Sequence, residues 1–166
     1  MKVEDRLEMY QLFIRSCAEY CSVAFHSSLT LAESQSLERL QSTCLKVILQ
    51  DNYVSYSSAL EFTGLKTLYE RREEKCLNFS VKCTKHSVNS RFFPLNQNYD
   101  KDIQCTLDSK INNDQQCKNH RREPFYVNYA RTEDYRMSAI PYCQRLLNSH
   151  FKNKGLPKNI KSKEKV

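Results

Sequence analysis

The sequence predicts a mainly α-helical protein: a small helical array, then a long irregular loop and a disordered C-terminal tail. Glycine and proline are scarce, with 2 Gly and 4 Pro in 166 residues. This scarcity disfavours turn-rich sandwiches and barrels, and it excludes Gly-rich phosphate-binding loops. Apolar residues recur at steps of three and four in the first half of the chain, which is the period of an amphipathic helix. Two capping boxes mark where helices begin.

The first predicted helix carries one apolar stripe over about five turns. Because an amphipathic helix turns its apolar stripe inward, we expect these side chains, aromatic rings included, to lie in the core. The stripe consists of Leu7, Tyr10, Phe13, Ile14, Cys17, Tyr20, Cys21 and Ala24.

The second predicted helix begins at a capping box formed by Thr30 and Glu33, in which each side chain accepts from the other residue's backbone N–H. Its apolar stripe consists of Leu37, Leu40, Cys44, Val47 and Ile48. A short helix over residues 56–62 follows, and Gly64 supplies the left-handed residue that ends it.

The third long helix begins at a second capping box, Thr67 with Glu70. Its stripe consists of Leu68, Arg72, Cys76, Phe79 and Cys83. Since Arg72 falls on this stripe, the arginine either extends its charged end to solvent, pairs with an acid, or faces a partner.

The chain divides into four predicted zones. They are a helical domain at residues 4–86, a polar irregular loop at 87–130, a short helical piece at 131–148 and a lysine-rich disordered tail at 149–166. The net charge of +7 arises mainly in the tail, because residues 1–86 hold 11 basic and 11 acidic side chains. A basic tail on a nearly neutral body is weak evidence for a nucleic-acid-binding protein.

The chain contains no stretch of about 20 apolar residues, and its first residues are charged, so we expect neither a membrane span nor a signal peptide. We expect an intracellular protein, in the cytoplasm or the nucleus, whose eight cysteines stay reduced.

Six segments, taken in order, resemble the C-terminal part of the reverse transcriptase encoded by jockey-like non-LTR retrotransposons. The resemblance covers residues 7–83 and resumes at 92–96 and 131–148. The segments are YQLFIRSCAEYCSVAFHSSLT, LERLQSTCLKVIL, YVSYSSAL, GLKTLYERREEKCLNF, FFPLN and ARTEDYRMSAIPYCQRLLN.

The resemblance implies that residues 4–86 are a thumb-like domain, which in such polymerases lies against the backbone of the template–primer duplex. The family's catalytic carboxylates lie in the palm, in a Tyr-x-Asp-Asp box that this chain lacks. Two-metal phosphoryl transfer needs such clustered carboxylates. We therefore expect a non-catalytic fragment with no cofactor. Two departures are Phe25, where the family commonly has Trp, and the middle loop, which does not align.

Five basic residues are the main candidates for contact with an RNA or RNA–DNA duplex: Arg71, Arg72, Lys66, Arg39 and Lys46. Further basic residues that could contact it are Arg15 and, in the loop, Arg121 and Arg122. Lysine and arginine placed along one face bind phosphates largely through counterion release. The alternative is a solvated helix face on which neighbouring glutamates pair with the arginines. Two other functions stay open: a protein–protein interaction module that uses exposed apolar helix faces, or a relic reading frame without function.

Two Cys-x-x-His pairs form the one pattern that suggests a metal site: Cys83 with His86, and Cys117 with His120. Four such ligands could enclose a structural zinc ion. In the alternative interpretation, Cys83 completes the helix stripe and the other three are incidental loop residues. We favour this alternative and expect no metal, because the linker between the pairs is longer than in zinc fingers.

Overall fold

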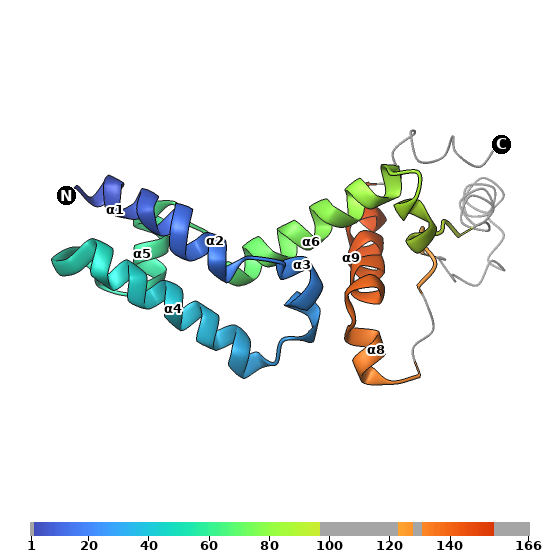
Figure 1. Ribbon diagram of the computed structural model, residues 1–166, viewed down its shortest axis with the longest axis horizontal. Coiled ribbons are helices and arrows are strands. Elements are labelled where there is room, and N and C mark those ends of the chain that lie inside the picture. Colours follow the sequence, from blue (N-terminus) through green and yellow to red (C-terminus); the bar gives the residue numbers. More distant parts are fainter. Residues whose placement is uncertain (1, 97–122, 128–130, 155–166) are drawn as a thin grey trace, which may run out of the picture. The chain divides into compact units, whose positions relative to one another are not determined.

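The computed structural model describes residues 2–96, 123–127 and 131–154, and these are mainly helical, as predicted (Figure 1). In these ranges no strand forms, and an antiparallel bridge joins Leu95 to Phe125. The chain splits into two compact units, Met1–Cys76 and Leu77–Val166, and each is described by itself.

The N-terminal unit is built of short helices around one long helix. Its elements are α1 (Val3–Met9), the π-helix η1 (Tyr10–Ile14), α2 (Arg15–Ala18), α3 (Ser22–Phe25), the 3-10 turn η2 (His26–Ser28), α4 (Leu31–Leu49), the 3-10 turn η3 (Gln50–Asn52), α5 (Tyr56–Thr63) and the start of α6 (Leu68–Lys85).

The helix starts follow the predicted capping boxes. Glu33 N donates to Thr30 Oγ1 at 3.3 Å, and Thr30 N donates to Glu33 Oε2 at 2.8 Å. The same reciprocal pair joins Thr67 and Glu70, with both bonds at 3.2 Å. Gly64 ends α5 with φ +64°, as predicted. These local signals therefore fix the ends of three helices.

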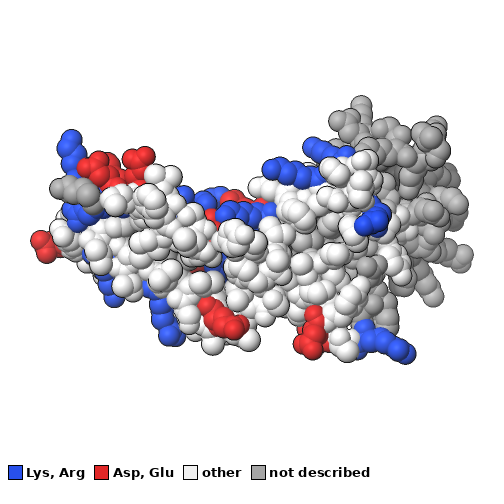
Figure 2. Space-filling view, in the orientation of Figure 1, with Lys and Arg blue, Asp and Glu red and all other residues white. Residues whose placement is uncertain are grey.

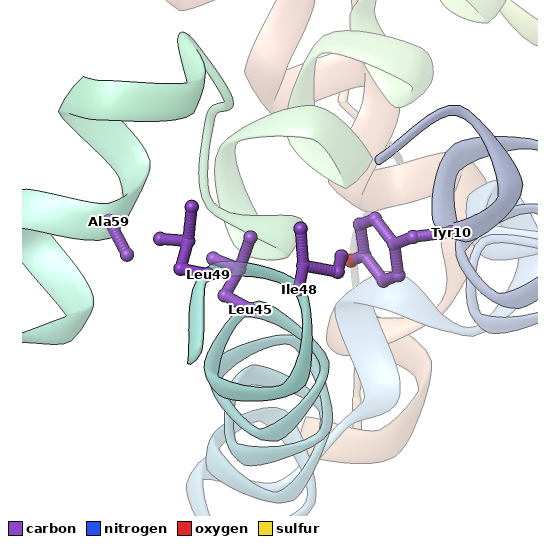
Figure 3. Close-up of a cluster of buried hydrophobic side chains, with 5 residues drawn as sticks. All are labelled: Tyr10, Leu45, Ile48, Leu49 and Ala59. Atoms are coloured by element: carbon purple, nitrogen blue, oxygen red, sulfur yellow. The ribbon is translucent and has the colours of Figure 1, made fainter. Parts of the chain in front are cut away.

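The core of the N-terminal unit lies on α4, which packs against α1 and α5. Figure 3 shows a cluster of five of its buried side chains, namely Tyr10, Leu45, Ile48, Leu49 and Ala59. Each large apolar side chain buried here stabilises the fold by about 1.5–3 kcal/mol. The polar end of Tyr10 is satisfied as well, because its hydroxyl donates to Gln41 Oε1 at 3.1 Å.

The predicted inward stripe of the first helix is wrong for residues beyond Tyr10. Phe13 and Tyr20 are 64% and 77% exposed, whereas Glu19 is 5% exposed. The π-helix η1 is the physical reason, since it fits one extra residue into a turn. In an uninterrupted α-helix, Glu19 would lie about 180° from Tyr10. The extra residue removes about 100° of that rotation and brings Glu19 to the buried side.

The other two predicted stripes are only partly buried. On α4, Leu40 and Val47 are exposed while Ile48 is buried. On α6, Phe79 is 45% exposed, so its prediction as a core residue is also wrong. The apolar members Leu68, Cys76 and Cys83 of the α6 stripe are buried as predicted, and Arg72 is buried with them.

The C-terminal unit contains the end of α6, the 3-10 turn η4 (Asn89–Phe92), α8 (Glu133–Met137) and α9 (Ala139–Lys154). The last helix runs past the end predicted at residue 148. Its buried face explains the extension, because Leu147 and Phe151 continue the face begun by Cys143.

Two buried amides of α9 hold the segments that flank residues 97–122. Gln144 Nε2 donates to Phe92 O at 2.7 Å. Asn148 binds both backbone groups of Phe125, accepting from its N–H at 2.8 Å and donating to its carbonyl at 2.9 Å. The Leu95–Phe125 bridge lies between these flanks, so both are fixed on α9.

Candidate nucleic-acid interface

Two cations of α6 converge on one buried carboxylate, that of Glu19. Arg71 donates to it twice, through Nε at 2.5 Å and Nη2 at 3.2 Å, and Lys75 Nζ donates at 2.5 Å. The Glu19 side chain is only 3% exposed, but those of Arg71 and Lys75 are 28% and 42% exposed. The carboxylate is therefore shielded from solvent, while its two cationic partners keep an accessible side.

A third cation adds to the positive charge at this place. Arg15 interacts electrostatically with both Arg71 and Glu19, and burial together with the Arg71 charge lowers the pKa of Arg15. Burial raises the pKa of Glu19, but the hydrogen bonds and charges of Arg71 and Lys75 outweigh it, so that pKa is lowered overall. Three cations against one ionised carboxylate leave the cluster of Arg15, Glu19, Arg71 and Lys75 net positive. We call it the Glu19 cluster.

Figure 2 shows basic and acidic atoms side by side along the upper edge of this view, above α2 and α6. Much of the surface below them is uncharged. Such a limited basic area suits contact with a few phosphates rather than with a long tract of backbone.

Arg72 lies in the interior, in contrast to its neighbour Arg71. It has no exposed surface, and its Nη2 donates to Ser34 Oγ at 3.0 Å. Burial lowers the pKa of Arg72, and the charges of nearby Glu38 and Glu19 offset part of that effect. Of the three roles considered for this arginine on the helix stripe, extension of its charge to solvent is thus wrong.

Glu38 of α4 fixes the start of α6, and with it the position of the Glu19 cluster. Its carboxylate accepts from the Tyr56 hydroxyl at 2.6 Å, from Tyr69 N at 2.7 Å and from Leu68 N at 3.3 Å. A carboxylate at a helix N-terminus is favoured by the helix dipole as well as by these bonds. One side chain therefore joins α4, α5 and α6.

The other predicted nucleic-acid residues lie apart from the Glu19 cluster or have partners of their own. Lys66 forms an exposed ion pair with Glu74. Arg39 and Lys46 are exposed on α4, and Lys46 lies over the Tyr53 ring at 5.4 Å. In the described part of the chain no hydrogen bond or ion pair joins these three to the Glu19 cluster, and their contact with nucleic acid stays a prediction.

The residues of the two Cys-x-x-His pairs are described only in part. Cys83 is buried on α6, and His86 Nδ1 accepts from Val88 N at 3.3 Å. Cys117 and His120 lie outside the described residues, as do the basic residues of the same loop. Within the described ranges no group of three or more potential ligands comes together.

Lys75 and Glu19 are the members of the cluster that sequence reasoning missed. The spacing of Arg71 and Lys75, four residues apart on one helix, was a usable signal for a shared partner. Nothing local pointed to Glu19, because its burial depends on the π-helix and its partners lie more than fifty residues away.

Several large apolar side chains of the N-terminal unit are exposed. On the stretch from α1 to α2, Met9, Leu12 and Phe13 are 50%, 60% and 64% exposed. Tyr20 follows at 77%. None of the described helices is both long and apolar enough to span a bilayer. In general, a large exposed apolar area marks a surface that contacts a partner.

Comparison with known proteins gives no match to a family model, to a curated protein or to a solved structure.

Proposed function

We propose that this chain is a non-catalytic helical module that binds the sugar–phosphate backbone of an RNA or RNA–DNA duplex, in the manner of a reverse-transcriptase thumb. The observation that carries the proposal is the Glu19 cluster, in which two cations bind one shielded carboxylate and a third, Arg15, lies near enough for its charge to act there. Arginine donors are suited to phosphate oxygens, and a net positive cluster attracts them without reading sequence.

The internal carboxylate supports this function. Glu19 holds Arg71 and Lys75 next to each other, so little side-chain entropy is lost when both meet the backbone. Because each phosphate contact releases counterions, binding of this kind weakens steeply with salt. The mostly helical fold agrees with a thumb-like module, and the resemblance of the sequence segments gives the polymerase context.

The test measures binding of the full chain to a labelled RNA–DNA hybrid by fluorescence anisotropy over a salt series. Replacing Glu19, Arg71 and Lys75 together by Gln removes the cations without leaving an unpaired buried carboxylate. We expect weaker binding and a salt slope lower by about 2, near one for each lost phosphate contact. The matched control is Lys82→Gln with Arg91→Gln, which removes two exposed cations that are not among the candidate duplex contacts.

If the control loses as much affinity as the triple variant, the effect is one of charge alone and the Glu19 cluster is not the site. Unchanged binding in the triple variant would reject the proposal directly. Because the lysine-rich tail alone attracts polyanions, all variants keep it, and only differences between them count.

A second candidate function, a protein–protein interaction module, is favoured by the exposed apolar residues Met9, Leu12, Phe13 and Tyr20. Such contact is driven by apolar burial, so it should persist at high salt. Sedimentation or pull-down at high salt therefore separates it from duplex binding. Replacing Leu12 and Phe13 by Ser should abolish association of this kind and leave nucleic-acid affinity unchanged.

A further inference from the structure

The buried guanidinium of Arg72 lacks a full set of acceptors. Its exposed surface is 0%, and among the described residues only its Nη2 atom has a hydrogen-bond partner, Ser34 Oγ at 3.0 Å. The buried Nε and Nη1 atoms have no hydrogen-bond partner among the described residues. A buried cation with two unmatched donors is costly, by several kcal/mol in general terms. An acceptor beside Arg72 would remove that cost.

The side chains around Arg72 do not provide this acceptor. Glu38 and Glu19 are close enough for their charges to act on Arg72, but each carboxylate already accepts hydrogen bonds from other groups. Burial and the Arg72 charge lower the pKa of His26, so this imidazole stays neutral at neutral pH. The buried hydroxyl of Ser27, next in the chain, also has no partner among the described residues.

We propose that Arg72 holds a small monovalent anion of the halide class, chloride in ordinary solution, which accepts from Nε and Nη1. The complete burial of the side chain sets the size of the ligand. A phosphate or a partner's carboxylate would have to remain connected to solvent or to its own chain, whereas a single-atom anion can be enclosed. This site is distinct from the Glu19 cluster, and it does not depend on nucleic-acid binding.

The test measures unfolding of the full chain at constant ionic strength while chloride replaces gluconate. An anion that binds only the folded state stabilises it in proportion to the logarithm of its concentration. Each tenfold rise in chloride above the dissociation constant should lower the unfolding equilibrium constant by about tenfold. Equal stability in chloride and gluconate would overturn the proposal.

Arg72→Met is the variant that removes the site while keeping an apolar side chain of similar length. We expect its unfolding midpoint to be the same in chloride and gluconate, with the dependence retained in Arg39→Met, the matched change at an exposed arginine of α4. A chloride dependence that survives Arg72→Met would show that the anion binds elsewhere.

A measurement on the unaltered protein covers the case in which Arg72→Met does not fold. The line width of the chloride-35 resonance should increase when folded protein is added, and bromide or iodide should reverse the broadening by competition. The same broadening with urea-unfolded protein would contradict a site that exists only in the folded chain.

Discussion

Replacing Glu38 should destabilise the N-terminal unit more than its position on a half-exposed helix suggests. The carboxylate accepts two short hydrogen bonds, from the Tyr56 hydroxyl at 2.6 Å and from Tyr69 N at 2.7 Å. A hydrogen bond to a charged group contributes about 1.5–3 kcal/mol. Since Glu38 is only partly buried, we take the lower end for both bonds. Glu38→Ala should then cost about 3 kcal/mol.

The assay is urea-induced unfolding followed by far-UV circular dichroism. Tyr56→Phe removes one of the two short bonds and should cost about 1.5 kcal/mol. In a double-mutant cycle with Glu38→Gln, the two changes should couple by about 1 kcal/mol, because they share one bond. Burial and the Glu38 carboxylate raise the pKa of Tyr56, so its phenol should also ionise at lower pH in Glu38→Ala.

Glu61→Ala is the matched control, a change at an exposed glutamate of α5. It should change stability by less than about 0.5 kcal/mol. If Glu38→Ala costs no more than this control, Glu38 does not join the three helices and the reasoning from its hydrogen bonds is wrong. If the losses of stability in the two single variants simply add in the double variant, Glu38 and Tyr56 do not share a hydrogen bond that stabilises the fold.

Three further predictions follow from the packing and charges. Leu45→Ala should cost about 2–5 kcal/mol in urea unfolding because Leu45 is fully buried, whereas the exposed Val47→Ala should change stability by less than about 0.5 kcal/mol. The folded pKa values of His26 and Glu19 lie below their unfolded values, so the free energy of unfolding should fall as the pH drops, first below about 6.5 for His26 and then below about 4.5 for Glu19. In thermal unfolding, His26→Gln should remove the first of these two losses. A melting temperature that rises on acidification would contradict this sign. Replacing residues 97–122 by a short Gly/Ser linker should change stability by less than about 1 kcal/mol, since the flanks already meet at the Leu95–Phe125 bridge, and loss of cooperative unfolding would show otherwise.

Local sequence signals predicted where the helices begin and end. Thr30 with Glu33, and Thr67 with Glu70, cap their helices through side chains three residues away, so the relevant physics lies within one turn. Gly64 likewise needs no distant residue, because its conformation at φ +64° disfavours other side chains. The mainly helical fold follows from such signals.

The charged groups of the candidate site could not be predicted in the same way. Arg71 and Arg72 are neighbours in a run of charged residues, yet one is half-exposed on Glu19 and the other is fully enclosed. A rotation of about 100° along the helix separates their environments. Which of them meets solvent depends on the placement of α6 against the rest of the unit, and Glu38 fixes that placement from thirty residues earlier in the chain. No local pattern carries this information.

The π-helix at Tyr10–Ile14 lets the first helical stretch hold one residue more than an ordinary turn, without rotating the residues that follow. Deletion of a single residue here would restore an ordinary turn and leave Arg15 to Tyr20 on the sides that they occupy now. A substitution that converted the π-helix to α-helix at unchanged length would instead rotate these residues together by about 100°. Glu19 would then move away from its two cations. Among related sequences, this turn is therefore a place where one residue can be gained or lost while the Glu19 cluster is kept.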